Sequence, residues 1–490
     1  MRVNYQVNTT PQFRIFSDDQ IEEIFFATLE VLRQTGVRVY QEEAVELLRE
    51  NGAYVTDDTL VRLPASLVEE AVAMAPARIV VAGRDRSKKI TLEKDHIFFG
   101  TGSDCPFIRD PYTNERRRYT YQDGYNAAKI ADSLPHIDFY MPLGLTSDVP
   151  IGTYDRHQFL ASLQGVTKPL VVTAVDGEGL ADQYYMACEV VGGEEAFQNA
   201  PLFVIYIEPS SPLEHTKDAT EKVLFAAEKN IPAIITPCPS AGGTAPATMA
   251  GVLVQSLSEA LSGIVIAQLR NPGAPVIMGG VATIIDMLTT IYSYGAPELV
   301  LLSAGLTEIS KWLGLPMFST AGCSDAKMVD QQAAIESAIS IALAALSGAS
   351  LIHDVGYIES GLVGSYDMLV MSNEIIGMVK RIMGGIPVDE ESLAVDVIAK
   401  VGPGGHFLGE KHTLRHFREF WLPELIDRSK CDDWEAAGAK TLGDRVHEKV
   451  INLIETYEPE PIPEDVENRL KEIIAQADAR HKAEEKVALA

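Results

Sequence analysis

The stretch Leu202-Phe-Val-Ile-Tyr-Ile207 is a short run of β-branched and aromatic residues, and a turn and a helix-like segment follow it. Seven other runs of this kind recur roughly 30 to 43 residues apart, which is room for one strand, one helix and two loops. Parallel strands joined by helical crossovers produce this rhythm, and eight such units close into a barrel. The eight runs are residues 96–100, 137–141, 169–173, 202–207, 233–236, 275–278, 316–319 and 350–353.

The predicted fold class is therefore α/β, a (β/α)8 TIM barrel over residues 96–386. An open doubly wound sheet is the alternative, and the first run has a second assignment, in a hairpin outside the barrel. Residues 1–95 are expected to form an N-terminal helical segment packed on the barrel. Its first helix starts at Ser17, where Gln20 completes a capping box. Residues 387–490 are expected to form a C-terminal helical extension.

The amino-acid composition argues against two classes of binding partner. Lys and Arg number 41 and Asp and Glu number 69, so the net charge is −28. This balance argues against nucleic acid and against an anionic membrane surface as partners, because both require a basic face. With 46% hydrophobic and 22% charged residues in 490, the chain is expected to fold around a large core.

The sequence also indicates where the protein is located. The five cysteines are far apart and form no CxxC pair, and the first 16 residues lack the apolar core of a secretory signal. The most apolar stretches, residues 252–269 and 333–352, are long enough to span a membrane, but each contains a glutamate, Glu259 or Glu336, and several serines. We interpret them as buried helices and expect a cytoplasmic protein with no membrane partner.

Several common cofactor and metal motifs are missing. The sequence contains no Walker loop, no GxGxxG and no GxSxG, so ATP, NAD and serine-hydrolase chemistry lose support. His412 and His416 are four residues apart on an expected helix, but the segment HTLRH lacks the glutamate of HExxH. We therefore assign no metal site.

Aromatic and acidic side chains follow several of the expected strands. Functional residues of a (β/α)8 barrel gather at the carboxyl ends of its strands. A cleft with aromatic walls, carboxylates and few basic groups suits a small cationic or zwitterionic ligand, because ring faces attract a quaternary ammonium. The residues that we expect around such a ligand are His353, Tyr357, Phe107, Phe99, Tyr206, Asp104, Glu208 and Glu359.

Each of these residues also has a structural interpretation. An aromatic residue after a strand belongs to the core more often than it touches a ligand. His353 follows the apolar triplet Ser350-Leu-Ile352, so a core histidine bonded to the backbone is its alternative.

Four segments spread over the chain carry specific patterns. They are Gly100-Thr-Gly-Ser-Asp-Cys-Pro-Phe107, Ala321-Gly-Cys-Ser-Asp-Ala-Lys327 with Asp330-Gln331, Pro403-Gly-Gly-His-Phe-Leu408 with His412-Thr and His416-Phe-Arg418, and Trp421-Leu-Pro-Glu-Leu-Ile-Asp-Arg428. Together they resemble the trimethylamine methyltransferase (MttB) superfamily, and the resemblance covers nearly the whole chain.

The resemblance implies a TIM barrel that transfers a methyl group from a methylated amine to the cobalt of a separate corrinoid protein. It also implies a homo-oligomer that does not itself bind the corrinoid tightly. The archaeal trimethylamine enzymes carry pyrrolysine near the segment equivalent to residues 351–361, and Val355 stands at that place here. This departure points to the members without pyrrolysine, which use quaternary amines. Glycine betaine is the first candidate, and proline betaine, carnitine and γ-butyrobetaine are alternatives.

A quaternary amine agrees with this set of residues. Its nitrogen leaves as a neutral tertiary amine and cobalt(I) is a strong nucleophile, so no general acid is required and no catalytic residue is assigned. His353 is the predicted partner of a substrate carboxylate. Two rival functions remain at this point: a metal-dependent TIM-barrel hydrolase, and a binding or sensor protein without turnover.

Overall fold

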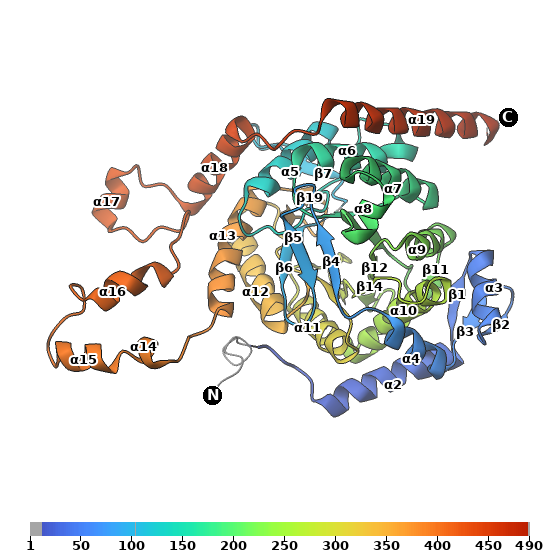
Figure 1. Ribbon diagram of the computed structural model, residues 1–490, viewed down its shortest axis with the longest axis horizontal. Coiled ribbons are helices and arrows are strands. Elements are labelled where there is room, and N and C mark those ends of the chain that lie inside the picture. The colour runs from blue at the N-terminus through green and yellow to red at the C-terminus, as the bar shows by residue number, and fades with distance from the viewer. Residues whose placement is uncertain (1–11, 103, 489–490) are drawn as a thin grey trace.

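The computed structural model describes residues 12–102 and 104–488, so parts of the N-terminal segment (1–11), of the first motif (103) and of the C-terminal extension (489–490) lie outside the described residues. A curled sheet of seven parallel strands forms the centre of the protein, in the order β6-β17-β16-β14-β12-β10-β9 (Figure 1). Its strands are β6 (Phe98–Thr101), β9 (Leu170–Val172), β10 (Phe203–Ile207), β12 (Ala233–Ile235), β14 (Val276–Gly279), β16 (Met317–Thr320) and β17 (Leu351–Val355).

Seven of the eight expected runs are thus strands of one parallel sheet, and the eighth, residues 137–141, forms bridges only. Phe139 forms a parallel bridge to Gly100 of β6, and Tyr140 forms one to Leu170 of β9. The segment therefore lies between the two edge strands of the sheet. The first run is part of the main sheet rather than of a separate hairpin.

Apolar side chains on the inner face of the sheet form a separate buried cluster. Each strand has alternate side chains on its two faces, so one set points inward and the other packs under the helices. A hairpin of β4 (Ile79–Ala82) and β5 (Lys89–Leu92) covers the amino-terminal end of the strands and completes the cluster (Figure 1). The buried residues of this cluster are Ile79, Val81, Ile90, Leu92, Phe139, Met141, Val171, Val204, Ile234, Ile277, Phe318 and Leu351.

Helices cover the outer face of the sheet. They are α5 (Tyr121–Ser133), α6 (Tyr154–Gly165), α7 (Gly177–Val191), α9 (Lys217–Lys229), α10 (Met249–Arg270), α11 (Pro297–Trp312), α12 (Gln331–Ser347) and α13 (Tyr366–Met383), with the short η1 (Ile151–Thr153) and α8 (Glu194–Asn199) in the connections. Among the described residues, α10 is the one helix long and apolar enough to cross a membrane, and most of it is buried inside the fold. Burial is what we expected for this stretch.

The N-terminal segment is not purely helical, and that part of the prediction is wrong. The capping box at Ser17 is present and starts the first of its helices. Between the helices, three short strands form a small sheet with a two-residue strand from the main body. The elements are α2 (Asp18–Gln34), β1 (Val37–Val39), α3 (Glu42–Glu50), β2 (Tyr54–Thr56), β3 (Leu60–Arg62), α4 (Ala65–Met74) and the added strand β11 (Glu214–His215).

Short strands at the carboxyl end of the main sheet shape its loops. One small sheet has the order β18-β19-β7-β8, and another pairs β13 with β15. Their bounds are β7 (Phe107–Arg109), β8 (Arg116–Arg118), β13 (Ser240–Ala241), β15 (Thr283–Ile284), β18 (Tyr357–Ile358) and β19 (Val363–Gly364).

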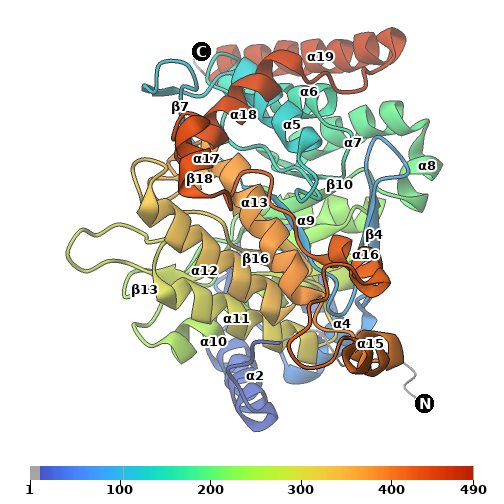
Figure 2. The same cartoon turned by 90° about the vertical axis from the view of Figure 1, so that its left-hand side faces the viewer.

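The described elements after α13 are helices, and they differ in how they contact the body. The helix α19 (Glu464–Ala488) packs along α7, where Arg480 pairs with Asp182 and Arg469 pairs with Glu189. Between α13 and α18 the chain extends away from the body (Figures 1 and 2). The remaining elements are α14 (Glu390–Leu393), α15 (Val395–Val401), α16 (Lys411–His416), η2 (Phe417–Glu419), α17 (Cys431–Ala436) and α18 (Leu442–Thr456).

One buried lysine fixes the bridging segment between β6 and β9. The ammonium of Lys168 donates to the backbone carbonyls of Ala131, Leu134 and Ile137, each at 2.7 Å. These carbonyls lie at the end of α5 and at the start of residues 137–141. A cation at a helix C-terminus also interacts favourably with the helix dipole.

Replacing Lys168 with methionine should lower the free energy of unfolding by about 3 kcal/mol, because three buried carbonyls lose their donor. Urea unfolding followed by circular dichroism measures this as a lower midpoint with an unchanged slope. The matched variant Lys89→Met, at an exposed position of β5, should be neutral. Equal midpoints for the two variants would show that Lys168 has no such role.

Candidate active site

The candidate site begins with three rings from three strands of the main sheet, β17, β16 and β10. The His353 ring of β17 lies against Phe318 of β16, with ring centroids 4.0 Å apart and the planes tilted by 30°. Tyr206 of β10 closes the group, 5.8 Å from Phe318 and 6.3 Å from His353. Because all three lie on the inner side of the sheet, they form the floor of its carboxyl-terminal mouth.

A bulge in β17 brings Asp354 to the same floor. Consecutive side chains of a regular strand point to opposite faces, but the register of β17 against β6 shifts between Ile352 and Val355, and Asp354 has φ 79°. His353 and Asp354 can therefore face each other, with 3.0 Å between His353 Nε2 and Asp354 Oδ1. Thr320 donates a hydrogen bond to the other carboxylate oxygen of Asp354.

Both ring nitrogens of His353 are engaged. Nδ1 lies 2.8 Å from the carbonyl oxygen of Ser319, which can only accept, so Nδ1 carries a proton. Nε2 faces the carboxylate of Asp354 at 3.0 Å. Since both residues are only 2% exposed, the pair is a buried fixed unit. It leaves neither ring nitrogen for a substrate carboxylate, which revises the role expected for His353.

Three tyrosines form a wall beside this floor. Tyr357 lies in β18, and Tyr294 packs edge-on against it at 5.4 Å. Tyr292 lies 5.3 Å from Tyr294 and shares a hydrogen bond of 3.0 Å with the thiol of Cys238. Burial raises the pKa of all three phenols well above the usual range, so they remain neutral.

Glu208 places a carboxylate beside the rings. The hydroxyl of Tyr206 donates to it over 3.0 Å, and burial raises the pKa of Glu208. Protein atoms surround Glu208 closely, and yet its side chain still reaches solvent. Tyr206, Tyr292 and Tyr294 show the same combination of a deep position and partial exposure. From this combination we infer that these residues line an open recess.

Asp104 and Lys222 lie at the side of this recess. Burial lowers the pKa of Lys222, and the negative charges of Asp218, Asp155, Asp176 and Asp104 oppose this effect. Glu208 is in turn close enough to Lys222 for the ammonium to lower the pKa of Glu208. Lys222 donates to the carbonyl of Ala174, which follows β9, at 2.8 Å. A lysine thus accompanies the two carboxylates at the mouth.

Asp325 acts as a clamp on the loops around the mouth. Its carboxylate accepts hydrogen bonds from the backbone N–H of Tyr294 and from the hydroxyls of Ser293 and Ser360. Those donors lie in the loops after β15 and β18. The clamp holds Tyr294 in place.

The structure separates the remaining predicted residues from this recess. Phe99 is fully buried on the outer face of β6, with the ammonium of Lys380 5.9 Å from its ring. Phe107 lies under the guanidinium of Arg116 at 3.6 Å, and Glu359 forms an ion pair with the same arginine.

Val355, the expected pyrrolysine equivalent, is buried at the end of β17. Its side chain packs so closely on Gly322 that a Cβ added to this glycine would meet Val355 first. The recess therefore contains Tyr206, Glu208, His353 and Tyr357 from the prediction, with Asp104 beside them, but not Phe99, Phe107 or Glu359.

Sequence reasoning missed Thr320, Tyr292 and Tyr294 in this group. The two tyrosines lie more than ten residues after β14, and only residues directly following an expected strand were considered. Asp354 directly follows the expected strand at residues 350–353, but nothing in the sequence indicated the bulge that turns it inward.

No metal cluster accompanies the recess. Within residues 12–102 and 104–488, no group of three or more His, Cys, Asp and Glu side chains is placed to hold a metal ion. His412 and His416 stack on each other at 4.3 Å, and His416 pairs with Glu419 at 2.7 Å.

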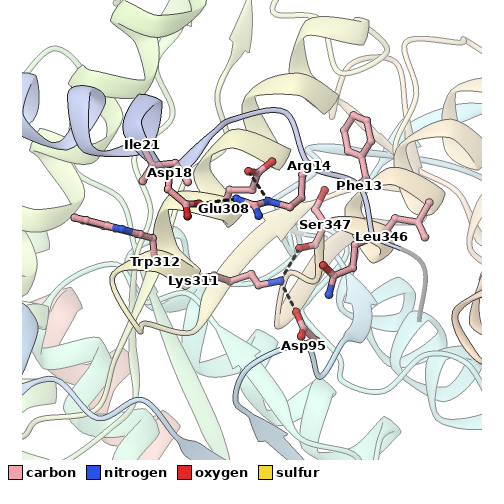
Figure 3. Close-up of a pocket in the computed structure, with 11 residues that line it drawn as sticks. Phe13, Arg14, Asp18, Ile21, Asp95, Glu308, Lys311, Trp312, Leu346 and Ser347 are labelled. Carbon is pink, nitrogen blue, oxygen red and sulfur yellow. Dashed lines mark hydrogen bonds and ion pairs between the residues drawn. The ribbon is translucent and has the colours of Figure 1, made fainter. Parts of the chain in front are cut away.

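A separate cavity of about 330 Å³ lies at the opposite end of the fold (Figure 3). Arg14 there contacts Asp18 and Glu308, and Lys311 contacts Asp95 and the carbonyl of Ser347. Asp95 precedes β6, and Ser347 ends α12, so the cavity lies at the amino-terminal end of the strands. In (β/α)8 folds that end contributes stability rather than catalysis.

Replacing Asp354 with asparagine should lower the free energy of unfolding by about 3 kcal/mol, because a buried ion pair loses one partner. Chemical denaturation measures the change, and Glu195→Gln, at an exposed position of α8, is the control with no expected effect. An Asp354→Asn protein as stable as the control would rule out the buried pair.

Comparisons with known proteins agree with the resemblance seen in the sequence. The chain matches the family described as trimethylamine methyltransferase (MTTB) over residues 1–482. It is 35% identical over 464 residues to trimethylamine methyltransferase MttB of Desulfitobacterium hafniense, covering 94% of each chain. It is 32% identical over 469 residues to a glycine betaine methyltransferase of the same species, covering 95% of this chain and 97% of the relative.

A solved structure supports the fold. The crystal structure of the Methanosarcina barkeri monomethylamine methyltransferase (MtmB) superposes with a TM-score of 0.52, covering 91% of this chain and 88% of that one. The two sequences are only 12% identical, so this likeness concerns the fold alone.

Proposed function

Because the chain belongs to the trimethylamine methyltransferase family, we propose that it transfers a methyl group from a quaternary amine to the Co(I) of a corrinoid protein. Glycine betaine is the proposed substrate, and dimethylglycine is the product. The observation that supports a quaternary amine is the recess itself, in which Tyr206, Tyr294 and Tyr357 accompany the carboxylate of Glu208. Membership in this family makes the protein a methyltransferase.

The recess matches the chemistry of a trimethylammonium group. Such a cation has no N–H to donate, so recognition depends on ring faces and nearby negative charge. The phenols remain neutral, the rings of Tyr206 and Tyr294 are partly exposed, and Glu208 adds negative potential at the open side. In the displacement one C–N bond breaks, its electron pair stays on nitrogen, and the methyl group forms a bond to cobalt. No proton moves, so the site needs no acid or base.

The carboxylate of glycine betaine requires a different partner from the one expected. His353 is fully engaged by Ser319 and Asp354. We assign the carboxylate to Lys222, whose ammonium uses one hydrogen on Ala174 and retains two. In this arrangement His353 is a positioning residue that holds the floor of the recess.

We further propose that residues 137–141 complete a closed (β/α)8 barrel and that the corrinoid protein docks over its mouth. Segments that follow different strands of the main sheet carry exposed apolar side chains. They include Met249, Met287, Leu288, Met328 and Leu362. Methionine side chains adapt readily to a partner that must bind and leave. We expect this reaction in the cytoplasm.

The reaction can be tested with chemically reduced cob(I)alamin. The protein is mixed separately with glycine betaine, proline betaine, carnitine and trimethylamine, and the appearance of methylcobalamin is followed by absorbance. Methylation from glycine betaine but not from trimethylamine is the expected result. Transfer from trimethylamine alone contradicts the proposal, and so does a lack of transfer both to cob(I)alamin and to the cognate corrinoid protein. Zinc retained through purification would instead support a metal-dependent hydrolase.

Two glutamates provide a matched pair for testing the site. Glu208→Gln should weaken binding of glycine betaine about tenfold, because the cation loses a nearby carboxylate. Glu359→Gln should change binding less than twofold, since Glu359 pairs with Arg116 away from the recess. Isothermal titration calorimetry measures both variants. If Glu359→Gln weakens binding and Glu208→Gln does not, the recess is assigned to the wrong residues.

A further inference from the structure

Glu259 is a carboxyl in the middle of the apolar helix α10. Its side chain is fully buried, and Arg270 at the end of the helix is the only other charged residue of α10. Burial raises the pKa of Glu259 to about 7. The methyl transfer described above does not use this group. A buried carboxyl costs stability unless its oxygens are hydrogen-bonded, so its partners indicate what it does.

Three hydrogen-bond contacts join Glu259 to its surroundings. The backbone N–H of Leu213 and the side-chain amide of Gln255 donate to Oε1, each at 2.9 Å. The hydroxyl of Ser211 lies 2.7 Å from Oε2. Leu213 and Ser211 belong to residues 208–216, the β10–α9 loop. The carboxyl thus attaches this loop to α10 at two points.

The arrangement of these contacts does not depend on the charge of Glu259. The two N–H donors share Oε1, whereas Oε2 faces a hydroxyl, which can donate to a carboxylate or accept from a protonated carboxyl. All three contacts are therefore compatible with both protonation states. A role that depends on these contacts is one of position rather than of charge.

The β10–α9 loop connects the two charged groups assigned to the substrate. Glu208 is its first residue, directly after β10, and Lys222 lies on the second turn of α9, which follows the loop. His215 near the end of the loop contacts Ser262 of α10 at 2.7 Å, and α9 packs along α10 (Figure 1). The path of the loop over α10 therefore fixes where α9 begins relative to Glu208.

We propose that Glu259 is a positioning residue: by anchoring the β10–α9 loop to α10, it sets the separation of Glu208 and Lys222 and so the fit of a zwitterion between them. This inference rests on the proposed function, in which Glu208 faces the ammonium and Lys222 the carboxylate. Glu208 is also held by its own strand and by the hydroxyl of Tyr206. Loss of the anchor should therefore displace Lys222 more than Glu208.

Two substitutions of Glu259 separate position from charge. Glu259→Gln removes the charge and keeps all three contacts, since its carbonyl can replace Oε1 and its amide can donate to the hydroxyl of Ser211. Glu259→Leu is similar in volume and removes all three. Ser211→Ala removes one contact and leaves the helix unaltered, and Ser66→Ala, at an exposed position of α4, is its control.

Isothermal titration calorimetry with glycine betaine and with tetramethylammonium measures the fit. Glu259→Leu should weaken glycine betaine about tenfold and tetramethylammonium at most about twofold, because the second ligand has no carboxylate to place against Lys222. Glu259→Gln should stay within about threefold of the wild type for both ligands. Ser211→Ala should fall between the two, and it carries the same test on a protein whose helices are unaltered. Ser66→Ala should match the wild type.

Hydrogen exchange followed by mass spectrometry tests the anchor without any ligand. Peptides from the β10–α9 loop should exchange faster in Glu259→Leu than in Glu259→Gln or the wild type, because the N–H of Leu213 loses its acceptor. Equal exchange in all three proteins would overturn the proposal, and so would faster exchange with unchanged affinity for glycine betaine.

Two further outcomes distinguish the causes. A Glu259→Gln protein that binds glycine betaine as weakly as Glu259→Leu would overturn the proposal, because charge rather than position would then be responsible. A wild type that binds neither ligand would refute the proposed function itself, and this inference with it. A wild type that binds both, with a Glu259→Leu protein of equal affinity, would overturn the positioning role alone.

Discussion

The bulge in β17 is the constraint on which the candidate site depends. It turns two consecutive side chains, His353 and Asp354, to the same side of the sheet and lets them pair. Ser319 and Thr320 of β16 then fix the outer atoms of this pair. Two neighbouring strands are thus joined through buried side chains at the level where the rings of Tyr206 and Phe318 meet. A regular strand would have placed Asp354 under the helices, where a carboxylate is costly.

The recess combines features that favour the binding of a cation that has no N–H to donate. Its ionisable groups are buried enough to keep phenols neutral, and its carboxylates lie beside aromatic faces. A hydrolase would need a metal or an activated water, whereas a methyl transfer needs orientation and exclusion of solvent. The clamp formed by Asp325 provides such orientation, since it fixes the loop that carries Tyr294. The surrounding loops therefore contribute as much to the site as the strands do.

The sequence was sufficient to predict the strands and part of the site. Seven runs became parallel strands because apolar, β-branched segments with regular helical spacing have few other arrangements. Phe99 shows the limit: both faces of β6 are buried, so the sequence alone cannot tell that Phe98 points inward and Phe99 outward. Tyr294 shows another limit, because a long loop returns it to the mouth far from its strand. The strands between residues 37 and 62 were too short to give an alternating pattern.

The helix α19 is translated late, although it packs against helices that are translated early. Arg480 pairs with Asp182 of α7, 298 positions earlier in the chain, and Asp182 also accepts from the buried Arg156 of α6. On the ribosome, α6 and α7 emerge long before α19 does. Until then an acidic, incompletely paired surface is exposed on the growing chain, and domains of this size commonly fold through such intermediates. The last described helix thus completes a face that the residues before Glu464 leave unpaired during translation.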